Sequence, residues 1–119
     1  MIRVVRLTRH PLQEGQREAL LRAAQELLGA EAIEVIEEAV TVSSAEEVVA
    51  LVEQHGAQLL EAVLPIGLLA QVVPALKARG VPVVRSVMER QLTEQGEAIF
   101  TFRGYELVER VEIVTRPLP

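Results

Sequence analysis

Two short segments of the chain hold the residues best suited to bind an anion and act on it. Arg9 and His10 follow an apolar run at the start of the chain, and Arg85, Ser86 and Arg90 stand close together later on. A guanidinium group can form two parallel hydrogen bonds to a phosphate, and a histidine that titrates near neutrality can serve as a general base or as a cation. These residues therefore indicate a small phosphate-bearing ligand.

Each of these side chains also has a structural interpretation. His10 can cap a surface loop, Arg9 can be a solvated charge, and Arg85 can pair with one of the 17 glutamates. Arg103 can pair across a subunit boundary. The second histidine, His55, precedes a glycine and is expected to complement the dipole at a helix carboxyl end.

The composition of the 119 residues narrows the chemistry. There is no Asp and no Cys, and of the 12 basic residues only Lys77 is lysine. Magnesium and two-metal nuclease sites depend heavily on Asp, so we expect metal-free chemistry and no metal ligands. Without cysteine, a reduced, cytoplasmic setting is expected. The preference for Arg and Glu suits a thermophilic source, although a GC-rich genome has the same effect.

Several partners are excluded on the same basis. The net charge of −5 does not favour duplex nucleic acid, and no apolar run approaches the roughly 20 residues that span a bilayer. Neither a G-x-G-x-x-G nor a G-x-x-x-x-G-K-[ST] motif is present, so we predict no dinucleotide or ATP cofactor.

The apolar spacing predicts how these residues are positioned. The strand patterns cover 2–8, 32–42, 58–64 and 81–87. They alternate with helix patterns over 13–28, from a start at Ser43-Ser44 to 55, and over 68–79. Such alternation with short connections predicts an α/β fold, with a Rossmann-like, mainly parallel sheet flanked by helices. No linker or repeat interrupts it, so residues 1–119 are expected to form a single domain.

The end of the chain follows a different pattern. Segments 98–102 and 107–114 resemble strands, and Arg103-Gly104-Tyr105 between them resembles a turn. This predicts a C-terminal β-hairpin or an antiparallel extension at one sheet edge. Phe100 and Phe102 are expected in a core or an interface.

In an open parallel sheet, ligands bind beyond the carboxyl ends of the strands. That rule selects the segments 8–11, 41–44, 64–67 and 85–90, and Tyr105 in the late turn is suited to stack on a base. The candidate ligand-binding residues are therefore Thr8, Arg9, Ser43, Gly67, Arg90, Arg103 and Tyr105.

Three sequence motifs resemble those of one family. They are Arg-His-Pro-Leu at 9–12, Val-Arg-Ser-Val-Met-Glu-Arg at 84–90 and Ile-Phe-Thr-Phe-Arg-Gly-Tyr at 99–105. Together they resemble the small stand-alone CRISPR-associated Rossmann-like (CARF-related) ring nucleases of type III systems. The resemblance implies a homodimer that binds cyclic tetra-adenylate across its two-fold axis and cleaves it without a metal, which switches off type III CRISPR signalling. It also implies that His10, Arg85 and Ser86 are catalytic.

The chain departs from that family at two places. Arg9 stands where we expect serine, and Leu64-Pro65 where we expect Gly-Asp. Attack by the ligand's own 2′-hydroxyl needs neither Asp nor metal, so cleavage is retained as the expectation. Two alternatives stay open: a cyclic oligoadenylate sink or regulatory interaction module that does not cleave, and an enzyme acting on another small nucleotide.

Overall fold

The computed structural model describes residues 1–119 and confirms the alternation of strands and helices. The elements are β1 (Ile2–Leu7), α1 (Gln16–Leu28), β2 (Ile33–Glu38), α2 (Ala45–His55), β3 (Leu59–Ala62), α3 (Ile66–Lys77), β4 (Val83–Leu92) and β5 (Ala98–Leu107). Each predicted helix and strand up to β4 is present, with ends displaced by a few residues. None of the helices is long and apolar enough to cross a bilayer.

One five-stranded sheet organises the chain, in the order β2-β1-β3-β4-β5. The first four strands run parallel, and β5 pairs antiparallel with β4 at the edge. This confirms the predicted α/β class: a Rossmann-like sheet with an antiparallel edge extension.

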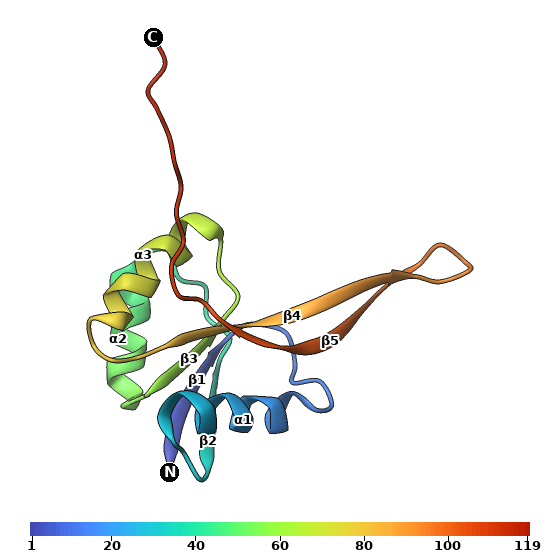
Figure 1. Ribbon diagram of the computed structural model, residues 1–119, viewed down its shortest axis with the longest axis horizontal. Helices are drawn as coiled ribbons and strands as arrows, with labels where there is room; N and C mark the ends of the chain where they lie inside the picture. The colour runs from blue at the N-terminus through green and yellow to red at the C-terminus, as the bar shows by residue number, and fades with distance from the viewer.

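Alternate residues of the central strands supply the two cores, because successive strand side chains point to opposite faces. Helices α2 and α3 lie against one face and α1 against the other (Figure 1). In one core, Val5, Leu7 and Leu60 of the sheet pack against Val48 of α2 and Val72 of α3. In the other, Val4, Leu59 and Val84 of the sheet pack against Leu20 and Ala24 of α1.

The helix ends and the proline of the third helix have simple local causes. Gly29 and Gly56 end α1 and α2 in the left-handed region, at φ of 67° and 59°, which glycine adopts without strain. Pro74 lies inside α3, which continues through it from Ile66 to Lys77 as one helix.

The prediction for the end of the chain was wrong about which segments form the hairpin. Strand β4 does not stop at Val87 but continues to Leu92, and it pairs with one continuous β5. The turn lies at Thr93–Glu97, where Thr93 N donates to Glu97 O (2.9 Å) and Gly96 adopts a φ of 81°. Gly104 belongs to a bulge rather than a turn: the register shifts opposite Val87 and Met88, and its φ is 151°. Residues 108–114 form no strand.

The part of this hairpin beyond the bulge, residues 88–102, is called the arm. Strand β3 pairs only with the first two residues of β4, so the rest of β4 runs past the carboxyl edge of the sheet. The arm projects from the body of the molecule, and the C-terminal segment leaves it in another direction (Figure 1). The radius of gyration is 15.6 Å, whereas a compact chain of this length has about 13.5 Å.

Candidate functional site

The strand order defines where a ligand is expected to bind. From β1 the chain moves outward to β2, and from β3 it moves the opposite way to β4, so the connections diverge between β1 and β3. The carboxyl ends of these two strands lie side by side, with Val63 N donating to Leu7 O at 3.2 Å. Doubly wound sheets bind ligands in the crevice at this switch point.

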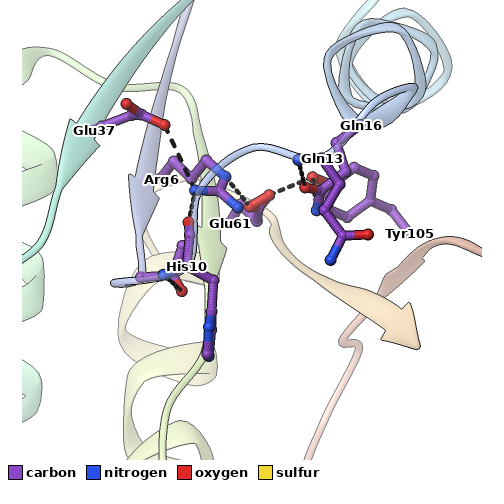
Figure 2. Close-up of polar contacts among 8 residues, drawn as sticks. Arg6, His10, Gln13, Gln16, Glu37, Glu61 and Tyr105 are labelled. Carbon is purple, nitrogen blue, oxygen red and sulfur yellow. Dashed lines mark hydrogen bonds and ion pairs between the residues drawn. The ribbon is translucent and has the colours of Figure 1, made fainter. Parts of the chain in front are cut away.

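The loop after β1 presents two exposed side chains there. Arg9 donates a hydrogen bond to the Thr41 hydroxyl and has no carboxylate partner. Thr8 Oγ1 accepts from His10 N at 3.1 Å, which shapes the loop. The His10 carbonyl accepts from Arg6 Nη1 at 2.5 Å, and its ring points away from that contact (Figure 2). The loop is therefore held through its backbone, the His10 ring is exposed, and the exposed Arg9 guanidinium is held only by the Thr41 hydroxyl.

Two helices begin at this same edge, and their first turns differ. At α2, Ser44 Oγ accepts from Glu47 N (3.2 Å), and the Glu47 carboxylate accepts from Ser43 N (3.2 Å) and Ser43 Oγ (2.8 Å). Ser43 and this helix end are thus already satisfied by an acid. Helix α3 has no side-chain cap and no acid in its first turn, which contains Gly67. Its free N–H groups remain able to bind an anion.

Arg85 lies beside the start of α3. With Ile66, Leu69 and Arg110 it lines a hollow of about 420 Å³. Its guanidinium pairs with Glu106 on β5, directly across the strand register. Arg85 therefore forms an ion pair with a glutamate, which was one of the two roles expected for it. It also lines the hollow.

The other predicted residues do not join this group. The segment 85–90 was expected to be a loop after the fourth strand, but it is part of β4. Ser86 therefore faces the side of the sheet opposite Arg85, where it is paired with Tyr105. Arg90 lies on the arm and is exposed. Arg103 pairs with Glu89, and this hydrogen bond lowers the pKa of the Glu89 carboxyl.

A buried polar network was not predicted from the sequence. Tyr105, which was expected in a turn and suited to stack on a base, lies in β5 and belongs to this network instead. Arg6, Gln16 and Glu61 are each no more than 3% exposed. Arg6 Nε lies 3.0 Å from Glu61 Oε2, and Arg6 Nη1 lies 3.5 Å from Glu37 Oε1. The Tyr105 hydroxyl donates to Glu61 and accepts from Gln16 Nε2 at 3.4 Å. Figure 2 shows this chain of contacts crossing from β2 to β5.

The electrostatics of this network follow from its burial. Desolvation raises the pKa of Glu61 above its usual 4.5, while the Tyr105 hydroxyl and the Arg6 guanidinium oppose the rise. Burial, followed by the hydrogen bond to Glu61, raises the pKa of Tyr105 above 10. The N–H of Arg6 Nε does not point at a Glu61 oxygen despite the short distance, so this contact is an ion pair rather than a directed hydrogen bond.

One sequence signal pointed to this network. Glu61 is the single acid inside the apolar run Leu59–Leu64, and a strand buried on both faces in the middle of a sheet rarely holds an unpaired carboxylate. Its partner Arg6 occupies a similar position in β1. The two face each other because β1 and β3 are neighbours in register at these residues.

The raised pKa of Glu61 predicts a pH dependence of stability. Above pH 4.5 the unfolded chain loses this proton before the folded chain does, so the contribution of Glu61 to stability falls as the pH rises through its folded pKa. In urea titrations between pH 4 and pH 7, the difference in unfolding free energy between the native chain and Glu61→Gln should fall with rising pH. Glu89→Gln serves as the contrast, because the lowered pKa of Glu89 gives the opposite sign. Equal slopes for the two variants would contradict this assignment.

No group of three or more histidine and glutamate side chains is arranged to hold a metal ion. Comparisons with protein-family models, curated proteins and solved structures find no match to this chain.

Proposed function

We propose that this chain binds cyclic tetra-adenylate at the switch point between β1 and β3 and cleaves it without a metal. One observation carries the proposal: exposed Arg9 and His10 follow β1, and the uncapped amino end of α3 follows the neighbouring strand β3, so both belong to the edge where such sheets bind ligands. On this basis we infer that the protein removes the cyclic oligoadenylate signal of a type III CRISPR system, as the resemblance of its motifs implies.

The chemistry of the edge suits a phosphodiester that carries bases. Arg9 and the free N–H groups of α3 provide contacts for phosphate oxygens. Val40, Val63 and Ile66 follow β2 and β3 at the same edge and are 47%, 54% and 57% exposed. Adenine rings can pack against such apolar side chains. A nucleotide therefore fits this edge better than inorganic phosphate does.

A cyclic tetranucleotide has repeat symmetry that a two-fold dimer matches, so each copy supplies the same contacts to half of the ring. We therefore propose a homodimer with the ligand across its axis. The arm runs past the carboxyl edge of the sheet, so in this proposal Arg90 approaches the ligand from the partner subunit.

The proposed cleavage uses the ligand's own 2′-hydroxyl. His10 accepts the proton from this hydroxyl, the 2′-oxygen bonds to the neighbouring phosphorus, and the bond from phosphorus to the 5′-oxygen breaks. The 5′-oxygen takes up a proton, and a 2′,3′-cyclic phosphate remains. Arg9 stabilises the charge that develops on the phosphorane oxygens.

The second candidate function is a module that binds the ring, or a protein partner, without cleavage. Arg85 and Arg103 favour this alternative, because both are held in ion pairs with glutamates of the same chain. Binding without products in an overnight incubation with labelled cyclic tetra-adenylate would select it.

Replacing Arg9 with alanine tests the proposed site. We expect affinity for cyclic tetra-adenylate to fall at least about tenfold by isothermal titration, because a hydrogen bond to a charged group is lost. Arg79→Ala is the matched control, since Arg79 follows the opposite end of α3 and pairs with Glu53; its affinity should match that of the native chain. If the native chain does not bind the ring, the proposal fails. If the two variants are equally weakened, the ligand binds elsewhere.

A further inference from the structure

The two faces of the arm differ in character. Side chains alternate along each strand, and the bulge keeps Phe102 on the side of Tyr105, with their ring centroids 5.1 Å apart. The paired residues Met88 and Phe102, Arg90 and Phe100, and Leu92 and Ala98 share this side, which we call the apolar face. It gathers every aromatic residue of the chain on one side of the β4–β5 ribbon.

Nothing in the chain covers the outer part of the apolar face. Phe100 is 56% exposed and Leu92 is 64% exposed. A two-stranded ribbon that packs on nothing is at best marginally stable in water. The arm therefore presents a surface whose burial would stabilise it.

The charges of the arm exclude several kinds of partner. On the opposite face, Glu89 already accepts from Arg103 and from Gln91 Nε2 (3.0 Å). Residues 88–102 contain one arginine and three glutamates. An acidic ribbon is repelled by nucleic acid and by anionic lipid, so an apolar protein surface is the partner that fits.

We propose that the apolar face of the arm packs against the same face of a second copy of this chain. Four side chains of the apolar face are exposed (Arg90, Leu92, Ala98 and Phe100) and Met88 and Phe102 are partly exposed, so the face amounts to on the order of 400–500 Å² per copy, the size of a functional surface patch. Two copies that covered it fully would bury about 1,000 Å², the lower limit for a specific interface. A self-complementary contact of this kind closes around a two-fold axis, so it does not extend to a third copy.

Arg90 is compatible with this packing. It is the only charged residue on the apolar face and has no carboxylate partner in its own chain. Its long apolar stem can lie against the packed rings while the guanidinium stays at the rim of the interface, where the proposed function has it meet the ligand. The inference deepens the homodimer of the proposed function by assigning its contact surface, and it does not depend on the ligand.

The test is the oligomeric state of the full chain without any nucleotide. In sedimentation equilibrium over a range of concentrations, the apparent mass of the native chain should rise from that of the 13.1 kDa monomer towards twice that value. Phe100→Glu should weaken this association at least about thirtyfold, as expected at the centre of a small interface. Ile99→Glu is the matched control: Ile99 is the neighbouring residue, is 48% exposed and faces the other side, so this variant should associate like the native chain.

Circular dichroism establishes that the variants fold, and Leu92→Glu replaces Phe100→Glu if the latter does not. A native chain that stays monomeric at the highest concentration overturns the inference, as does equal loss of association in Ile99→Glu and Phe100→Glu. A monomer that still binds cyclic tetra-adenylate overturns this inference and the proposed dimer but leaves the proposed binding site in place. A dimer that does not bind the ring overturns the proposed binding and cleavage but leaves this inference in place.

Discussion

Replacing Arg6 with methionine is expected to lower the free energy of unfolding by about 3–5 kcal/mol at neutral pH. The substitution keeps most of the side-chain volume but leaves the carboxylate of Glu61 buried without its cation. Tyr105 still donates to that carboxylate, but a neutral hydroxyl does not replace the lost charge. Urea denaturation at one fixed protein concentration measures the change, since association would otherwise shift the midpoint.

Two comparisons establish the cause of this loss. Arg79→Met removes an ion pair whose side chains are both about half exposed, so it should cost less than about 1 kcal/mol. Adding Glu61→Leu to Arg6→Met removes the stranded charge and should restore most of the stability. If Arg6→Met proves as mild as Arg79→Met, the network does not contribute as its burial implies.

The second large effect is expected at His10. His10→Ala should slow cleavage of cyclic tetra-adenylate by about 10²–10⁴-fold, the usual contribution of a general base, while affinity changes little. Affinity should be retained because Arg9 and the amino end of α3 are unchanged. Single-turnover assays with excess protein separate the chemical step from binding and product release.

His55→Ala is the control for this variant, because the only other histidine is engaged with Glu38 at 2.7 Å. A ring carrying 2′-O-methyl groups should bind to the native chain and remain intact. Unchanged cleavage by His10→Ala contradicts the assigned role, and cleavage of the methylated ring contradicts the route of attack.

The parallel part of the fold was predictable because its signals are local. Helices α1 and α2 have apolar stripes and glycines at their ends, and β1 and β3 are mainly apolar, with prolines or polar residues after them. These features determine element type before any tertiary contact forms, and short connections then favour parallel neighbours.

The arm was not predicted because loops have the same mixed pattern of polar and apolar residues. Residues 85–92 mix arginine, serine and glutamate, which is typical of a segment leaving a strand. It is also typical of a ribbon with one solvated face. The turn predicted at Gly104 was wrong for a related reason, since glycine suits a turn and a bulge equally well. Only the pairing partner decides between them.

The candidate site was predictable as a location but not as a set of side chains. Position after β1 selected Thr8, Arg9 and His10, and the structure brings these to the edge that also holds Gly67. Arg85 and Ser86 are adjacent in sequence, yet they face opposite sides once the segment is a strand. Whether an arginine meets a glutamate across a hairpin depends on register, which a single sequence does not specify.

The bulge at Gly104 has a consequence for the solubility of the protein. The outer edge of β5 is ten residues long and contains neither proline nor lysine, so it resembles the templates on which strands of other molecules add and aggregate. The bulge interrupts this edge near its middle and increases its twist, leaving only short regular stretches on either side. An incoming strand cannot pair along the whole edge, so growth into fibrils is disfavoured. The bulge does not affect the proposed dimer, because that contact uses the apolar face of the arm and not its edge.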